Sequence, residues 1–108
     1  MERRITKTVN IDKISIGSSH PIAVQTMYSL PLPHIEDDKG FEQIMTKLRT
    51  WATMGCHLVR FSYPDSKQKE SFAKICQESP IPIVADIHFD WRLAIEALNC
   101  NAAKIRIN

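Results

Sequence analysis

The sequence predicts an α/β fold in which parallel β-strands alternate with helices. Three apolar segments, at 58–63, 83–89 and 102–108, are rich in branched residues and end in polar or ionisable side chains, which is typical of strands that carry a site at their tips. The stretches that separate these segments have the 3.6-residue apolar period of amphipathic helices. Such alternation implies parallel strands that are joined by right-handed crossovers.

Composition and charge narrow the class of protein. The 108 residues are 44% hydrophobic and 24% charged, which is ordinary for one modest globular domain. A net charge of +2 provides no strong field to attract nucleic acid or an anionic membrane surface. The sequence has no apolar run of the length that a signal peptide or a membrane span requires. We therefore expect a cytoplasmic protein that binds neither nucleic acid nor membrane.

The start of the chain predicts a small β-ribbon. Two short segments, 9–11 and 14–16, alternate apolar and polar side chains before a Gly-Ser-Ser-His-Pro stretch breaks the pattern. We divide the chain accordingly into an N-terminal β-ribbon and lead-in at 1–20 and a sheet-and-helix part at 21–108. The first strand of the sheet is expected to begin at Ile22.

Three amphipathic segments predict the helices. The first extends over about 38–54, where apolar residues recur at i, i+3, i+4 and i+7, and a glycine follows its end. Asp37 or Asp38 can cap its start. The second extends over about 66–77 and is followed by Ser-Pro-Ile-Pro, which forces an extended chain. Asp90 is a suitable cap for the third.

The spacing of the strands allows two architectures. The predicted strands begin near residues 22, 58, 83 and 103, a repeat that fits a β/α barrel or an open doubly wound sheet. A closed eight-stranded barrel needs roughly 250 residues, so a barrel interpretation makes this chain the first half. Half a barrel would have two unpaired strand edges and an exposed apolar face, which predicts association.

Polar residues at the ends of the strands are the candidates for binding, because ligands of parallel β/α folds bind at the carboxyl ends of the strands. Arg60 and Arg106, on separate strands, can converge on a diphosphate through bidentate, charge-assisted hydrogen bonds. The alternative is that either arginine only neutralises Asp86. The full set of candidates is Gln25, Arg60, Asp86, His88, Arg106 and Asn108.

His88 has two interpretations. It shares a strand face with Asp86, and it can act as a phosphate donor or general acid, or it can simply be a hydrogen-bonded histidine. A divalent metal held by Asp86 and His88 is the weaker hypothesis. The other three histidines are expected to be ordinary turn, loop or core-edge residues. We therefore predict no metal site and assign no catalytic residue within this segment.

The cysteines and the loop after the first strand point to no further chemistry. Cys56, Cys76 and Cys100 are odd in number and form no Cys-x-x-Cys pair, so they are expected to be small packing residues. The Pro-rich loop at 28–38 is either a lid over the strand ends or a rigid surface loop. The sequence lacks a glycine-rich phosphate loop, which argues against a P-loop fold.

Four segments resemble one enzyme family in collinear order. They are Pro-Ile-Ala-Val-Gln-Thr-Met at 21–27, Leu-Val-Arg-Phe-Ser-Tyr-Pro at 58–64, Pro-Ile-Val-Ala-Asp-Ile-His-Phe-Asp at 82–90 and Lys-Ile-Arg-Ile-Asn at 104–108. Together they resemble the amino-terminal half of the 4-hydroxy-3-methylbut-2-en-1-yl diphosphate synthases, and the resemblance covers nearly the whole chain.

This resemblance implies an amino-terminal TIM (β/α)8 barrel that binds a cyclic diphosphate, followed by a domain that carries a [4Fe-4S] cluster. Family members open 2-C-methyl-D-erythritol 2,4-cyclodiphosphate reductively in the non-mevalonate route to isoprenoids, with electrons from flavodoxin or ferredoxin, and the full-length protein is expected to be a homodimer. The chain would then be the first half of the barrel, with four parallel strands and three helices behind the β-ribbon. By position, Arg60, His88, Arg106 and Asn108 would hold the diphosphate, and Asp86 would orient them.

The sequence also departs from the family pattern. The family has a Thr-rich stretch where this chain has its Pro-rich loop, and it continues with Pro-Gly-Asn after Arg-Ile-Asn. The cluster ligands, a Cys-Pro-x-Cys motif with a later Cys and a Glu, belong to the part of the family beyond this segment. We therefore expect this polypeptide alone to be inactive.

Two alternative functions stay open. One is a non-catalytic, phosphate-binding half-barrel module or the product of a decayed gene. The other is a different barrel enzyme with an anionic substrate, such as a pterin-binding synthase.

Overall fold

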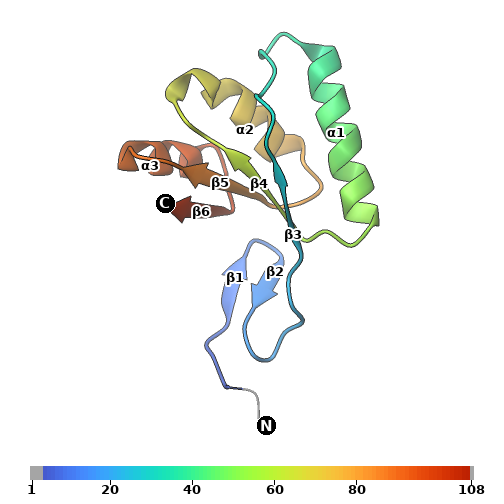
Figure 1. Ribbon diagram of the computed structural model, residues 1–108, viewed down its shortest axis with the longest axis vertical. Coiled ribbons are helices and arrows are strands. Elements are labelled where there is room, and N and C mark those ends of the chain that lie inside the picture. The colour runs from blue at the N-terminus through green and yellow to red at the C-terminus, as the bar shows by residue number, and fades with distance from the viewer. Residues whose placement is uncertain (1–3, 108) are drawn as a thin grey trace.

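The computed structural model describes residues 4–107 (Figure 1). Two short strands form an antiparallel ribbon near the amino end, and a separate four-stranded sheet carries the helices. In chain order the elements are β1 (Val9–Ile11), β2 (Ile14–Ile16), β3 (Gln25–Tyr28), α1 (Asp38–Thr53), β4 (Leu58–Ser62), the 3-10 turn η1 (Ser66–Gln68), α2 (Lys69–Glu78), β5 (Ile83–Ile87), α3 (Trp91–Asn99) and β6 (Lys104–Ile107).

The order of the strands favours a barrel over a doubly wound sheet. The sheet has the order β3-β4-β5-β6, and every neighbouring pair is parallel. Each strand therefore lies beside its successor in the sequence, as consecutive β/α units of a barrel do. A doubly wound sheet would instead reverse its order at a switch point. The prediction of four parallel strands, three helices and a leading β-ribbon is confirmed.

The helices bury one face of the sheet. Phe61 of β4 and Ala85 of β5 are fully buried against Leu48 of α1, Phe72 of α2 and Ala97 of α3. Because side chains alternate along a strand, the residues between these core positions point to the opposite face. That opposite face, which no helix covers in residues 4–107, is called the open face below.

The ribbon covers the lower part of the open face (Figure 1). Ile11 of β1 is buried in a small cluster with Leu58 and Val84, which lie near the amino ends of β4 and β5. The turn of the ribbon is tied down as well, since Lys13 Nζ donates to the carbonyl oxygen of Pro80 at 3.2 Å. Toward the carboxyl ends of the strands the open face is partly accessible: Arg106 is exposed and Ser62 is half-buried, whereas Asp86 between them is buried.

The ends of the helices follow local sequence signals. Asp37, rather than Asp38, caps α1 by accepting from the backbone N–H of Gly40 at 2.9 Å. Asp90 caps α3 as predicted, by accepting from the N–H of Arg92 at 3.0 Å. The second helix begins differently from the prediction: a 3-10 turn capped by Asp65 precedes α2.

The first core strand begins later than predicted, and this overturns one site candidate. β3 starts at Gln25, not at Ile22, because before it only the carbonyl of Val24 joins the ladder, accepting from the N–H groups of His57 and Leu58. Gln25 pairs with Leu58 at the amino end of the sheet. The prediction that Gln25 lies at a strand's carboxyl end is therefore wrong.

The loop between β3 and α1 is fixed to the helices. Ser71 of α2 donates its hydroxyl to the carbonyl oxygen of Pro33 at 2.7 Å. Leu32 and Ile35 pack against the main core. These contacts favour a rigid surface loop over a mobile lid.

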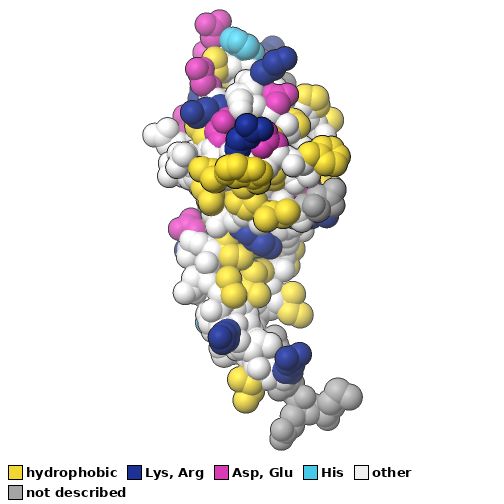
Figure 2. All heavy atoms as spheres, turned by 90° about the vertical axis from the view of Figure 1, so that its left-hand side faces the viewer, with side chains coloured by type: hydrophobic (Ala, Val, Ile, Leu, Met, Phe, Trp, Pro, Cys, Tyr) yellow, Lys and Arg dark blue, Asp and Glu magenta, His cyan; other side chains and the backbone are white. Residues whose placement is uncertain are grey.

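One side of the molecule has an exposed apolar surface. The exposed side chains of α1 and α2 are almost all polar, whereas α3 exposes Trp91, Ile95 and Leu98 at i, i+4 and i+7 spacing. Ile107 of β6 is exposed on the same side, and Figure 2 shows hydrophobic side chains gathered there. This surface agrees with the expectation for a half barrel.

Candidate functional site

A row of polar side chains crosses the open face near the carboxyl ends of the strands. The strand register pairs Ser62 with Asp86 and Asp86 with Arg106. One row deeper, Met27 pairs with Arg60. Since these positions share the parity that points away from the helices, all five side chains lie on the open face.

Asp86 lies between the two arginines. Its Oδ1 accepts from Nη1 of Arg106 at 3.0 Å, and its Oδ2 is 3.9 Å from Nε of Arg60. The side chain of Asp86 is largely buried, with a relative exposure of 9% for the residue. The sequence left open whether the arginines bind a ligand or neutralise Asp86. The structure shows that one carboxylate serves two guanidinium groups, so the row keeps an excess positive charge.

Arg60 lacks good hydrogen-bond acceptors. Its Nε atom is buried and has no hydrogen-bond partner among residues 4–107. Its Nη2 donates to Sδ of Met27 at 2.9 Å, and a thioether sulfur is a weak acceptor. A buried N–H left without a partner costs about 1–3 kcal/mol. An anion that brought additional oxygen acceptors to this guanidinium would remove that cost.

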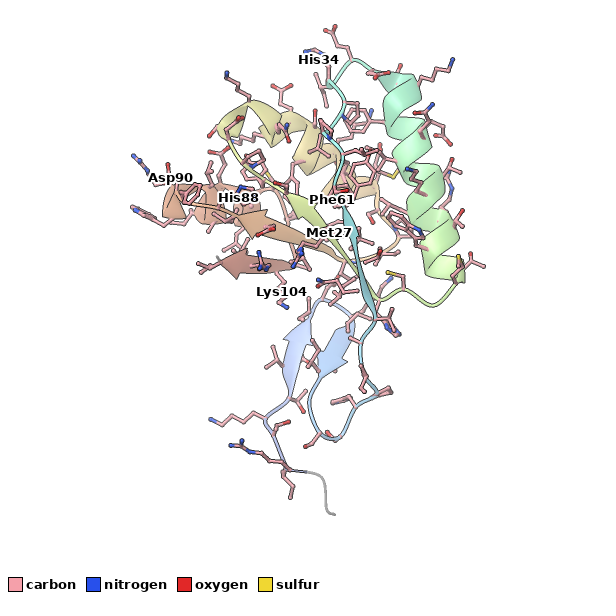
Figure 3. All side chains as sticks on the ribbon, in the orientation of Figure 1. Met27, His34, Phe61, His88, Asp90 and Lys104 are labelled. Atoms are coloured by element: carbon pink, nitrogen blue, oxygen red, sulfur yellow. The ribbon has the colours of Figure 1, made fainter. Side chains whose placement is uncertain are left out.

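His88 adds a hydrogen-bonding group at the rim. It follows the last residue of β5, is half-buried, and its Nε2 is 3.4 Å from Oγ of Ser62 (Figure 3). The imidazole and the hydroxyl can each donate a hydrogen bond to a phosphate oxygen. The site therefore combines two cationic forks with a hydroxyl and an imidazole.

The sequence interpretation missed two members of this group. Ser62 lies two residues after Arg60, so strand alternation alone could have placed it on the same face. Met27 was missed because its strand was expected to begin earlier, and because an apolar side chain gives no signal of contact with a guanidinium. Asn108, which was predicted to bind the diphosphate, lies outside the described residues.

A tether behind the site holds the loop that follows β4. The hydroxyl of Tyr63 donates to Oε1 of Glu96 in α3, and Oγ of Ser66 donates to Oε2 of the same carboxylate at 3.0 Å. Burial, followed by the hydrogen bond to Glu96, raises the pKa of the Tyr63 phenol. The tether joins the segment after Ser62 to the helix after His88, which supports the two sides of the rim.

The described residues do not form a site for a metal or an iron–sulfur cluster. No group of three or more His, Cys, Asp or Glu side chains lies close enough to hold a metal ion within residues 4–107. Burial raises the pKa of the Cys76 thiol to about 12 and also raises that of Cys100, so both stay protonated at neutral pH. Asp90 is occupied as a helix cap, and its pKa is lowered by the side-chain and backbone hydrogen bonds from Arg92.

The cysteines behave mainly as packing residues. Cys100 is buried, and Cys56 and Cys76 are partly buried beside the core.

None of the helices in the described part of the chain has the length and apolar character that crossing a bilayer demands.

Comparison with known proteins gives a consistent family. A family model described as the GcpE TIM-barrel domain matches residues 6–108. The chain is 37% identical over 106 residues to the 4-hydroxy-3-methylbut-2-en-1-yl diphosphate synthase (flavodoxin) of Natranaerobius thermophilus, which covers 98% of this chain. It is 40% identical over 104 residues, 96% of this chain, to the protein of the same name from Caldicellulosiruptor saccharolyticus.

The alignments cover only part of those relatives. The chain spans 28% of the length of each of these two proteins and 24% of the relative from Treponema pallidum, to which it is 36% identical over 99 residues, 92% of this chain.

Proposed function

Because the chain belongs to the GcpE TIM-barrel domain family, we propose that it supplies the diphosphate-binding part of a 4-hydroxy-3-methylbut-2-en-1-yl diphosphate synthase, an oxidoreductase of isoprenoid biosynthesis. The observation that carries the proposal is the incomplete hydrogen bonding of the Arg60 guanidinium. Its buried Nε has no partner among residues 4–107, and its Nη2 donates only to a thioether sulfur. A phosphate oxygen is the acceptor that such a guanidinium lacks.

Each of the remaining groups has its own role in the proposed binding of the diphosphate. Arg106 carries the second guanidinium, and it is held on the opposite side of Asp86 by a 3.0 Å hydrogen bond. Asp86 keeps the two cations apart and oriented, which prepares the site before a ligand arrives. His88, whose Nε2 is 3.4 Å from Oγ of Ser62, would donate a hydrogen bond to a phosphate oxygen at the rim. Asn108 belongs to the same proposed set by its position in the sequence.

The substrate that fits this proposal is 2-C-methyl-D-erythritol 2,4-cyclodiphosphate, which is opened reductively to 4-hydroxy-3-methylbut-2-enyl diphosphate. Its diphosphate would be bound by residues of this chain. The reducing equivalents would come through a [4Fe-4S] cluster whose ligands lie outside the described residues. We assign to this chain binding and orientation only, and we expect it to be inactive alone.

The wider context of the protein is proposed on the same basis. The names of the relatives specify flavodoxin, so flavodoxin is the favoured electron donor and ferredoxin is the alternative. A homodimer is proposed for the full-length enzyme. The cytoplasm is the proposed compartment, where the three free cysteines would stay reduced. Residues 1–20 would form the ribbon and lead-in, and 21–108 the partial barrel.

The test is a substitution series in the full-length enzyme. Arg60→Gln and Arg106→Gln should each weaken binding of the cyclic diphosphate by at least ~2 kcal/mol, because each removes one charged fork from the diphosphate. Isothermal titration calorimetry measures the change. Arg49→Gln is the matched control, since Arg49 is exposed on α1 and pairs with Glu42 at 2.8 Å. Unchanged affinity in both site variants would refute the proposed function.

A further inference from the structure

Met27 occupies an unusual position for a methionine. Its sulfur is 2.9 Å from Nη2 of Arg60, on the strand next to β4, and its residue is 53% exposed. Figure 3 labels Met27 on β3, the edge strand that pairs with β4, and the register with Arg60 places its side chain on the open face. A buried methionine fills space in a core, whereas this one combines access to solvent with contact to a binding-site cation.

We propose that Met27 is an oxidation site whose sulfoxide captures Arg60 and thereby weakens anion binding. This inference rests on the proposed function, because it concerns the same guanidinium. The oxidant is a two-electron oxygen donor of the hydrogen peroxide class. A sulfur lone pair of Met27 attacks one peroxide oxygen, the S–O bond forms and the O–O bond breaks. The attacked oxygen gives up its proton, the departing hydroxide takes up one proton, and water is released. Sulfur is oxidised and the peroxide is reduced.

The contact with Arg60 changes in kind when sulfur gains an oxygen. The thioether is a weak acceptor, but a sulfoxide oxygen carries a substantial negative partial charge and accepts strongly. Among the described residues, Arg60 makes no hydrogen bond to a stronger acceptor: Oδ2 of Asp86 forms an ion pair with its Nε at 3.9 Å, which is beyond hydrogen-bond distance, and that Nε is unpaired. The sulfoxide would therefore take a donor that an incoming phosphate needs.

The other described methionines provide internal controls. Met45 of α1 is only 6% exposed, and Met54, just after α1, is 78% exposed. Simple accessibility predicts that Met54 and Met27 are oxidised and that Met45 is protected. Only oxidation of Met27 should alter the site, because Met54 follows a helix on the opposite face of the sheet.

The experiment treats the 108-residue chain with dilute hydrogen peroxide and locates the sulfoxides by peptide mass spectrometry. Two signals are then measured: the Arg60 Nε–H resonance by NMR, and the affinity for inorganic pyrophosphate by calorimetry. We expect Met27 sulfoxide to shift the Arg60 resonance and to weaken pyrophosphate binding about tenfold, as loss of one charge-assisted hydrogen bond would. Methionine sulfoxide reductases should reverse both effects, which separates them from cysteine oxidation.

Three variants complete the test. In Met27→Leu, peroxide should change neither the Arg60 resonance nor the affinity for pyrophosphate. Met27→Gln should show the weakened affinity of the sulfoxide without any oxidation. Met54→Leu should respond to peroxide as the unsubstituted chain does. An unchanged Arg60 resonance after oxidation of Met27, or oxidation of Met45 as fast as Met27, would overturn the inference. If the unoxidised chain fails to bind pyrophosphate while the resonance still shifts, the proposed function fails and the capture of Arg60 stands.

Discussion

The two faces of the four-stranded sheet are built from alternate residues of the same strands, yet they are held together in opposite ways. On the helix-covered face, Phe61 and Ala85 are fully buried among apolar neighbours. On the open face, Arg60 and Asp86 are their direct chain neighbours, and Arg60 has one buried donor without a partner in residues 4–107. The comparison shows that one face of the sheet stabilises the fold by burying apolar side chains. The other face leaves a hydrogen-bond donor of Arg60 available to a ligand.

The largest effect should come from breaking the helix-covered face. Phe61 is fully buried and stacks on Tyr28 with ring centroids 5.0 Å apart. Phe61→Ala should lower the free energy of unfolding by roughly 3–5 kcal/mol, since it removes a large apolar side chain and leaves a cavity. Urea denaturation followed by circular dichroism measures this change. A loss below about 1 kcal/mol would mean that this face is not the stabilising one.

A smaller effect is expected on the open face. Asp86→Asn removes the one carboxylate that lies between Arg60 and Arg106 in the described structure. The free energy of unfolding should fall by about 1–2 kcal/mol, less than for a fully buried pair because Arg106 is partly exposed. The same denaturation assay applies, with Asp12→Asn as the control: Asp12 has a φ of 53° in the ribbon turn, a conformation that asparagine also adopts. Equal losses of unfolding free energy in the two variants would show that the position of Asp86 between the arginines does not stabilise the fold.

The smallest effect on the free energy of unfolding at neutral pH is expected for Cys76. In alkali, however, ionisation of its thiol should lower the free energy of unfolding. Burial raises the pKa of its thiol from 9.0 to about 12 in the folded chain. Ionisation therefore favours the unfolded state: the stabilising contribution is complete below pH 9 and is lost as the pH rises toward 12. At pH 10 the loss should be about 1.4 kcal/mol, or one pKa unit.

The comparison that isolates this thiol is Cys76→Ala against the unsubstituted chain, with urea midpoints recorded from pH 7 to 11. The variant should lose less stability than the unsubstituted chain above pH 9, while Tyr63, whose pKa is also raised, keeps some alkaline dependence in both. Parallel pH profiles would show that Cys76 is not protected by the fold.

Local patterns were sufficient for most of the fold. The ribbon, the three helices and the cap at Asp90 follow from periodicity and from capping chemistry within a few residues, and the structure has them. The shared face of Asp86 and His88 follows from the two-residue period of a strand. The start of β3 was not predictable in this way, because an extended segment becomes a strand only where a neighbour offers hydrogen-bond partners.

The sequence by itself therefore determined the class of fold, the helix-facing and open sides of each strand, and the chemical types available at the rim. Only the tertiary structure decided that β3 to β6 lie in sequential order, that Asp86 lies between Arg60 and Arg106, and that Met27 contacts a guanidinium 33 residues away in the chain. The physical reason is that strands pair through backbone hydrogen bonds, which are the same whichever side chains the paired residues have. Which side chains meet is set by register, and register depends on the packing of the whole sheet.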